Sequence, residues 1–140
     1  MLQVDFYVLS QGGEQARQIF ACKLAEKAYR LKNSVHIETA SEADSAKLDT
    51  LLWTFRDGSF VPHHVLGAEH LESPVTIGHT GTCGDGRDLL INLTARLPDQ
   101  LSAYARIAEL VSPDEESKRA SRQRFATYRD QGHQIRTHTI

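Results

Sequence analysis

Residues 4–37 read VDFYVLSQGGEQARQIFACKLAEKAYRLKNSVHI, and this stretch sets the fold class. Apolar residues alternate with Asp5 and Tyr7 over residues 4–8, which predicts a strand. After two glycines, apolar residues recur at helical spacing up to Leu31. A second short strand is predicted at residues 35–37, where two β-branched residues flank a histidine. This order of elements predicts a βαβ unit with a parallel pair of strands.

The same alternation of elements continues along the chain. Ser41 followed by Asp44 resembles a capping box, and it predicts the start of a helix with apolar residues up to Leu52. The periodicity is then lost over residues 53–74, where glycines and prolines are frequent. We therefore predict one α/β domain over residues 1–140, Rossmann-like, with a mostly parallel central sheet and helices on both faces.

Two further strands are predicted at residues 75–77 and 88–93, joined by the glycine-rich loop 78–86. This loop resembles a phosphate-binding loop, but Arg87 and Asp88 replace the lysine and the hydroxyl residue of that motif. The loop also precedes a strand, whereas a phosphate-binding loop opens a helix. We therefore expect a hairpin connection that binds no nucleotide.

Two more helices are predicted in the C-terminal part. Apolar residues over 98–111 fit helical spacing, and the proline suits a first helical turn. The last helix is predicted to have Ser112 as its N-cap and Pro113 at its first position, followed by acidic residues. Gly132 is expected to end this helix, and residues 134–140 to form a final edge strand.

The composition is that of an ordinary globular domain, with 140 residues, 40% hydrophobic and 24% charged. No apolar stretch approaches the roughly 20 residues that span a membrane, and the N-terminus lacks the pattern of a signal peptide. We therefore expect a cytoplasmic protein with no membrane partner. Cys22 and Cys83 lie far apart, which favours free thiols, with a single disulfide as the alternative.

No group of residues in the sequence predicts catalysis or a metal site. His63, His64 and His70 are close together, but no pattern of further ligands accompanies them. The glycines at 12–13 lack the spacing of a dinucleotide-binding fingerprint, and no serine lies in a nucleophile-elbow pattern. We expect no catalytic residue, no metal and no cofactor.

An aromatic segment is the first candidate for partner binding. Trp53, the only tryptophan, lies within eight residues of both Phe55 and Phe60. Pro62 removes a backbone donor, so this segment cannot pair fully as an interior strand. Because Trp and Phe bury large areas at low entropic cost, the segment is a candidate partner surface. The alternative is a loop that covers the core.

The final predicted helix is the second candidate. Residues 1–116 carry an excess of seven negative charges, whereas residues 117–140 carry an excess of five positive charges. At about 100° per residue, Lys118, Arg122 and Arg129 fall within about 40° of one another.

Aromatic residues flank these cations on the predicted helix, with Phe125 beside them and Tyr128 further round. Arginines next to an aromatic ring suit an acidic peptide with a hydrophobic end. They also suit the phosphates and bases of a single-stranded nucleic acid. A third possibility is a solvated helix face with both rings in the core.

Several motifs taken together resemble one known family. They are Phe6-Tyr7, Leu52-Trp53, Ser59-Phe-Val-Pro-His63, Pro74-Val75, Asp88-Leu-Leu-Ile-Asn-Leu93 and Arg122-x-x-Phe125-x-x-Tyr128-Arg129. Over nearly its whole length the chain is similar to the chi subunit of bacterial DNA polymerase III, part of the clamp-loader assembly. The resemblance implies a compact Rossmann-like domain that acts as a non-catalytic adaptor.

The resemblance also implies two protein partners. The first is the psi subunit of the polymerase, and the surface for it matches Trp53, Phe60, Val61 and Pro62. The second is the acidic, Phe-terminated C-terminal tail of single-stranded DNA-binding protein. The pocket for this tail matches Val111, Arg122, Phe125 and Tyr128. DNA would then be reached only indirectly.

This chain departs from the better-known relatives within the tail pocket. They carry Tyr and Lys where this chain has Phe125 and Ala126, and we expect Lys118 and Arg129 on the same helix face to compensate. The alternative function is direct binding of single-stranded nucleic acid through the basic C-terminal helix. The acidic excess of the rest of the chain opposes that alternative.

Overall fold

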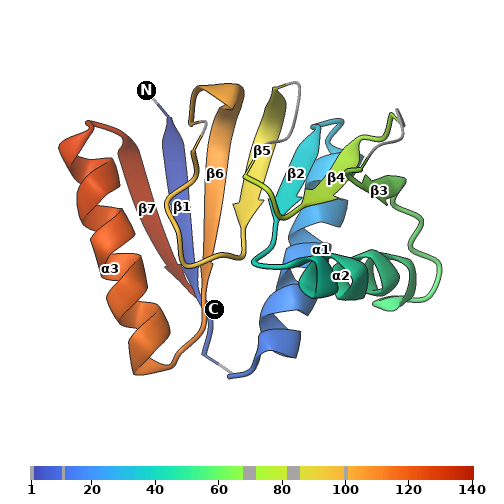
Figure 1. Cartoon of the computed structure of the whole chain (residues 1–140), viewed down its shortest axis with the longest axis horizontal. Helices are drawn as coiled ribbons and strands as arrows, with labels where there is room; N and C mark the ends of the chain where they lie inside the picture. Colours follow the sequence, from blue (N-terminus) through green and yellow to red (C-terminus); the bar gives the residue numbers. More distant parts are fainter. Residues whose placement is uncertain (1, 11, 68–71, 82–85, 100) are drawn as a thin grey trace.

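The computed structural model describes residues 2–10, 12–67, 72–81, 86–99 and 101–140. Its strands are β1 (Gln3–Val8), β2 (Val35–Glu38), β3 (His63–Val65), β4 (Val75–Gly78), β5 (Arg87–Asn92), β6 (Tyr104–Val111) and β7 (Gln134–Thr139). All seven lie in one sheet with the order β3-β4-β2-β5-β6-β1-β7 (Figure 1). Every neighbouring pair is parallel.

Three helices cover the two faces of this sheet: α1 (Glu14–Arg30), α2 (Glu42–Thr54) and α3 (Glu115–Asp130). Side chains of β6 alternate between two cores, so that Ile107 packs with residues of α3 and Ala108 packs with residues of α1 and α2. The helices α1 and α2 therefore share one face, and α3 covers the other. The predicted Rossmann-like α/β class, with helices on both faces, is confirmed.

Local signals in the sequence set several boundaries correctly. The hydroxyl of Ser41 accepts a hydrogen bond from the backbone N–H of Asp44 at 3.1 Å and caps α2, as the capping pattern predicts. Gly132 follows the end of α3 with a φ of 83°, in the left-handed region that favours glycine. The predicted edge strand is β7, which pairs with β1 in parallel.

The helix predicted over residues 98–111 is wrong. Among the described residues of this segment, only a 3₁₀ turn, η1 (Leu101–Ala103), precedes β6, and β6 lies between β1 and β5. Because both faces of this strand are covered, its residues from 107 onward are buried on both sides. A strand of this kind carries a continuous apolar run, and such a run also fits helical spacing.

Three smaller predictions are also corrected. The connection between β4 and β5 is no hairpin, because the two strands flank β2 and both run parallel to it. The short strand β3 lies in the region where no periodicity was found. The N-cap of α3 is Asp114 and not Ser112, and its carboxylate accepts the backbone N–H of Ser117 at 2.9 Å. The helix begins at Glu115, so Pro113 lies before it and does not occupy its first position.

Other predictions concern membranes, thiols and metals. No helix in the described part of the chain is long and apolar enough to cross a membrane. Cys22 is a free, buried thiol, whereas Cys83 and His70 lie outside the described residues. Among the side chains that the structure describes, no three of His, Cys, Asp and Glu gather as a metal site.

Candidate partner-binding surfaces

Trp53, in the last turn of α2, and Phe60, in the segment that follows α2, are exposed aromatic side chains. Trp53 is 51% exposed and Phe60 is 78% exposed, and Pro62 beside them is also exposed. We call these three residues the aromatic surface. Val61 lies between Phe60 and Pro62 in the chain, but its side chain is buried in the core. The predicted segment thus has one anchoring residue and three residues that face solvent.

Trp53 is held in place by a buried histidine. The ring centroids of Trp53 and His63 are 4.2 Å apart. His63 is fixed in turn, because its Nδ1 lies 2.6 Å from the carbonyl oxygen of Val61 and its Nε2 lies 3.1 Å from Oδ1 of Asp49. The fixed His63 ring therefore packs against the indole and restricts its motion, which lowers the entropy that a partner must remove on binding.

Glu26 of α1 fixes the loop that carries Phe60. Its buried carboxylate accepts hydrogen bonds from the guanidinium of Arg56 and the hydroxyl of Ser59, and Nη2 of Arg30 lies 3.7 Å away. The hydrogen bonds from Arg56 and Ser59 hold the pKa of Glu26 below its ordinary value. This ion pair ties the segment after α2 to α1 and so orients the aromatic surface.

The second candidate surface lies on α3. Lys118, Arg122 and Arg129, which we call the cationic stripe, line one side of the helix, with both arginines exposed and the lysine half-buried. Within the described residues, no acidic side chain pairs with Lys118 or Arg122. Arg129 has one weak contact, 3.5 Å from Nε to the exposed carboxylate of Asp130. The cations of this stripe are therefore available to an outside anion.

Phe125 lies between this stripe and the core. Its ring is half-buried, with its centroid 5.5 Å from that of Phe6 in β1. Val111 and Tyr128 lie deeper, and both are buried. The structure thus brings the predicted tail-binding residues together in two layers. The outer layer faces solvent in whole or part and consists of Lys118, Arg122, Phe125 and Arg129. The inner layer consists of Val111 and Tyr128.

A buried polar network fastens α3 to the sheet. Glu109 of β6 accepts the hydroxyl of Tyr128 at 2.7 Å, Nε of Arg124 at 3.0 Å and Nδ2 of Asn92 at 3.0 Å. Burial raises the pKa of Glu109, and the charge of Arg124 opposes that rise. Both carboxylate oxygens of Glu109 accept hydrogen bonds from side chains of β5 and α3, so this network ties α3 to two neighbouring strands.

A model of the family described as "DNA polymerase III chi subunit, HolC" matches residues 1–136. The chain belongs to this chi subunit family. It is 41% identical to the DNA polymerase III subunit chi of Pseudomonas aeruginosa, over 100% of this chain and 98% of that protein. It is 32% identical to the Haemophilus influenzae subunit chi, over 97% and 96% of the two chains. For the Escherichia coli subunit chi the identity is 28%, over 99% of each.

The chi family resemblance predicted from the sequence is therefore confirmed. Among solved structures, the crystal structure of T4 UvsW is similar with a TM-score of 0.69. That similarity covers 99% of this chain but only 41% of the UvsW chain, at 8% identity, and shows the fold alone.

The sequence did not reveal two buried acids, Glu26 and Glu109, whose hydrogen bonds position the two candidate surfaces. Glu26 interrupts the apolar stripe of α1, four residues after buried Cys22, and that interruption was the available signal. Glu109 was assigned to a helix, so its burial between α3 and the sheet could not be inferred. Both are buried acids whose partners come from distant parts of the chain.

Proposed function

We propose that this chi-family chain is a non-catalytic adaptor that joins the psi subunit of DNA polymerase III to the acidic C-terminal tail of single-stranded DNA-binding protein. The proposal rests on one observation, the placement of two separate candidate surfaces at opposite edges of one sheet. The aromatic surface adjoins α2, which packs beside β3 and β4, and the cationic stripe is on α3, which packs beside β6 and β7. Both partners can then bind at once.

The aromatic surface is the proposed psi site. Exposed rings held rigidly are typical of the residues that dominate binding at protein interfaces. Exposure of 51% and 78% for two large aromatic side chains leaves apolar area that a partner would cover. Val61, the fourth residue implied for this site, supports it from the core.

The cationic stripe with Phe125 is the proposed tail site. Arg122 can donate two parallel hydrogen bonds to a carboxylate, and Phe125 offers the exposed part of its ring to a hydrophobic end residue. The acidic excess over residues 1–116 disfavours bare DNA as the main ligand of this stripe. DNA is therefore reached through its binding protein, and we place the adaptor in the cytoplasm with its partners.

A structural role is also proposed for the one described cysteine. Cys22 is buried in the core between α1 and the sheet, and burial raises the pKa of its thiol to about 12. Such a thiol is protonated at neutral pH and is a poor nucleophile. Its chemistry fits an adaptor without catalytic activity.

The psi site is tested by co-purification of the two subunits. Trp53→Ala and Phe60→Ala are each expected to weaken the complex by about thirtyfold or more, as truncated hot-spot residues do. Ile140→Ala is the matched control, because Ile140 is an exposed apolar residue at the opposite edge of the sheet. Full psi binding by both aromatic variants would overturn this assignment.

The tail site is tested by titration with a short acidic peptide that ends in Phe. Arg122→Ala is expected to weaken binding about tenfold, because a hydrogen bond to a charged group contributes on the order of 1.5 kcal/mol. The control is Arg119→Ala, an exposed cation of α3 outside the stripe. If the parent chain, Arg122→Ala and Arg119→Ala bound the peptide with equal affinity, the assignment of the tail site to α3 would be wrong. Tighter binding of bare single-stranded DNA than of the peptide, with a steep dependence on salt, would favour the nucleic-acid alternative.

A further inference from the structure

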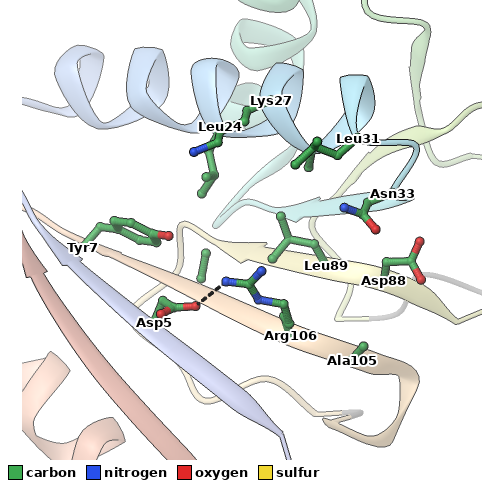
Figure 2. A pocket seen from close by; sticks show the side chains of 12 residues that line it. Asp5, Tyr7, Leu24, Lys27, Leu31, Asn33, Asp88, Leu89, Ala105 and Arg106 are labelled. Atoms are coloured by element: carbon green, nitrogen blue, oxygen red, sulfur yellow. Dashed lines mark hydrogen bonds and ion pairs between the residues drawn. The ribbon is translucent and has the colours of Figure 1, made fainter.

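A cavity of about 250 Å³ lies on the face of the sheet that α1 covers, away from both surfaces (Figure 2). Its roof is formed by Leu24 and Lys27 in the C-terminal half of α1 and by Leu31, which follows the helix directly. Its floor is formed by β1, β5 and β6. Neither proposed surface shares a residue with this cavity, so a ligand bound here would be distinct from both proposed protein partners.

Positive charge remains available on two sides of the cavity. In the floor, Nη2 of Arg106 donates to Oδ2 of Asp5 at 3.0 Å, and Nε2 of His138 lies 3.0 Å from the other oxygen of Asp5. Asp5 is thus already paired, while the Arg106 side chain is half-exposed and has no other polar partner in the part of the chain that the structure describes. In the roof, the ammonium group of Lys27 has no partner among the described residues. The hydroxyl of Tyr7 points into the same space (Figure 2).

Apolar side chains face these donors. Leu24 of α1, Leu31 directly after α1 and Leu89 of β5 line the cavity (Figure 2). Leu31 is 67% exposed, a high value for a leucine that borders a cavity. A ligand with an apolar part would cover Leu31, and a fully polar ligand would not.

The charge balance favours a ligand with a single negative charge. The carboxylate of Asp88 also lines the cavity, where it accepts the backbone N–H of Ser34 at 2.9 Å. A dianion such as a phosphate monoester would be repelled by this second acid and would have only two cations to pair with. A carboxylate needs only one pair of parallel N–H donors, and a single arginine side chain supplies such a pair.

We propose that this cavity binds a carboxylate attached to one large apolar group, with the carboxylate on Arg106 and Lys27 and the apolar group against Leu24 and Leu31. The volume is slightly below the roughly 300–1,000 Å³ of sites for larger ligands, which suits a single residue. A free N-acylated amino acid and the hydrophobic C-terminal residue of a peptide share this chemistry.

The test is an NMR titration of isotope-labelled protein with N-acetyl-leucine and with its neutral amide. The acid is expected to shift the backbone signals of Leu31, Leu89 and Arg106 at millimolar concentration, and the amide to bind about tenfold more weakly, because it lacks the charge. Equal binding of acid and amide, or shifts confined to α3, would overturn the proposal.

Variants locate the site without disturbing the core. Lys27→Gln and Leu31→Ser are each expected to weaken binding of N-acetyl-leucine several-fold, because both side chains are exposed at the cavity. Lys47→Gln, the same change on α2, is the control and should bind as the parent chain does. Unchanged binding in both cavity variants, with circular dichroism showing an intact fold, would place the ligand elsewhere.

A neutral pentapeptide that ends in Leu distinguishes the two sources of this chemistry. Tighter binding of the peptide than of N-acetyl-leucine identifies a peptide C-terminus as the ligand, and equal binding identifies a free small carboxylate. Either result supports the cavity as the binding site, provided that Lys27→Gln weakens the binding of that ligand. Peptide binding that Arg122→Ala weakens and Lys27→Gln leaves intact belongs to the α3 surface and contradicts the cavity proposal.

Discussion

Tyr128 lies under the cationic stripe with no exposed surface, and its hydroxyl donates to Glu109 at 2.7 Å. Burial, with the negative charge of Glu109, raises the pKa of Tyr128 well above its ordinary value, so this phenol stays protonated as a donor. A peptide on the outer side of α3 would not touch this ring. In the proposed tail site, Tyr128 would therefore act only by holding α3 on the sheet through Glu109.

Tyr128→Phe tests this role. The free energy of unfolding is expected to fall by about 1–3 kcal/mol, because one hydrogen bond to a buried carboxylate is lost. Tail-peptide affinity should change less than twofold. Urea denaturation and peptide titration measure the two quantities, with Tyr29→Phe as the control, since the Tyr29 hydroxyl has no hydrogen bond within the described residues. Weaker peptide binding at unchanged stability would mean that the tail reaches Tyr128 directly.

Single residues differ in how far the sequence reveals their roles. Trp53 and Phe60 could be singled out because aromatic residues are rare and the local pattern there is irregular. The exposure of Arg122 followed from helical spacing alone. Glu109 and Arg124 could not be paired in advance, because their contact requires α3 to pack on β6.

Among the elements, β6 shows why a helix and a buried strand are hard to separate. Its neighbours β1 and β5 pair with it along both edges, and helices cover both of its faces. Apolar side chains are then needed at consecutive positions, and neither helical nor strand periodicity stands out. By contrast, β1 was predicted correctly because Asp5 and Tyr7 alternate with its apolar residues, and α2 because Ser41 marks its start.

Ile107→Ala tests the central position of β6. Ile107 is fully buried in the core beneath α3, so truncation is expected to lower the free energy of unfolding by about 2–5 kcal/mol. The neighbouring exposed change Ala105→Ser should stay within about 0.5 kcal/mol of the parent chain. Chemical denaturation measures both. A small effect of Ile107→Ala would contradict the assignment of this segment as an interior strand.

At the scale of the whole molecule, stability depends on buried acids that link distant segments. Asp5 joins β1 to β6 and β7, and Glu26 joins α1 to the loop after α2. Burial alone would raise the pKa of Asp5, but hydrogen bonds from His138 and Arg106 hold it below its ordinary value. For Glu26 the hydrogen bond from Arg56 has the same effect.

Acidification is therefore expected to destabilise the fold. An acid with a lowered pKa stabilises the folded state when ionised, so its contribution is present above its ordinary pKa, 4.5 for Glu26, and is lost as the pH falls through the lower folded value. The free energy of unfolding of Glu26→Gln should be lower than that of the parent chain near pH 7, and the two should converge towards pH 2–3. Glu42→Gln, an exposed acid, serves as the control. Parallel curves for parent and Glu26→Gln would contradict this linkage.

The strand order has a mechanical consequence. Seven strands give six spacings of about 4.8 Å, so the β3 and β7 edges are separated by roughly 30 Å of hydrogen-bonded sheet. In the proposed adaptor, this width of sheet would set the distance between the psi site and the tail site. Two proteins held at those edges would pull on each other through the backbone ladder, and tension during replication would load hydrogen bonds between all seven strands in series.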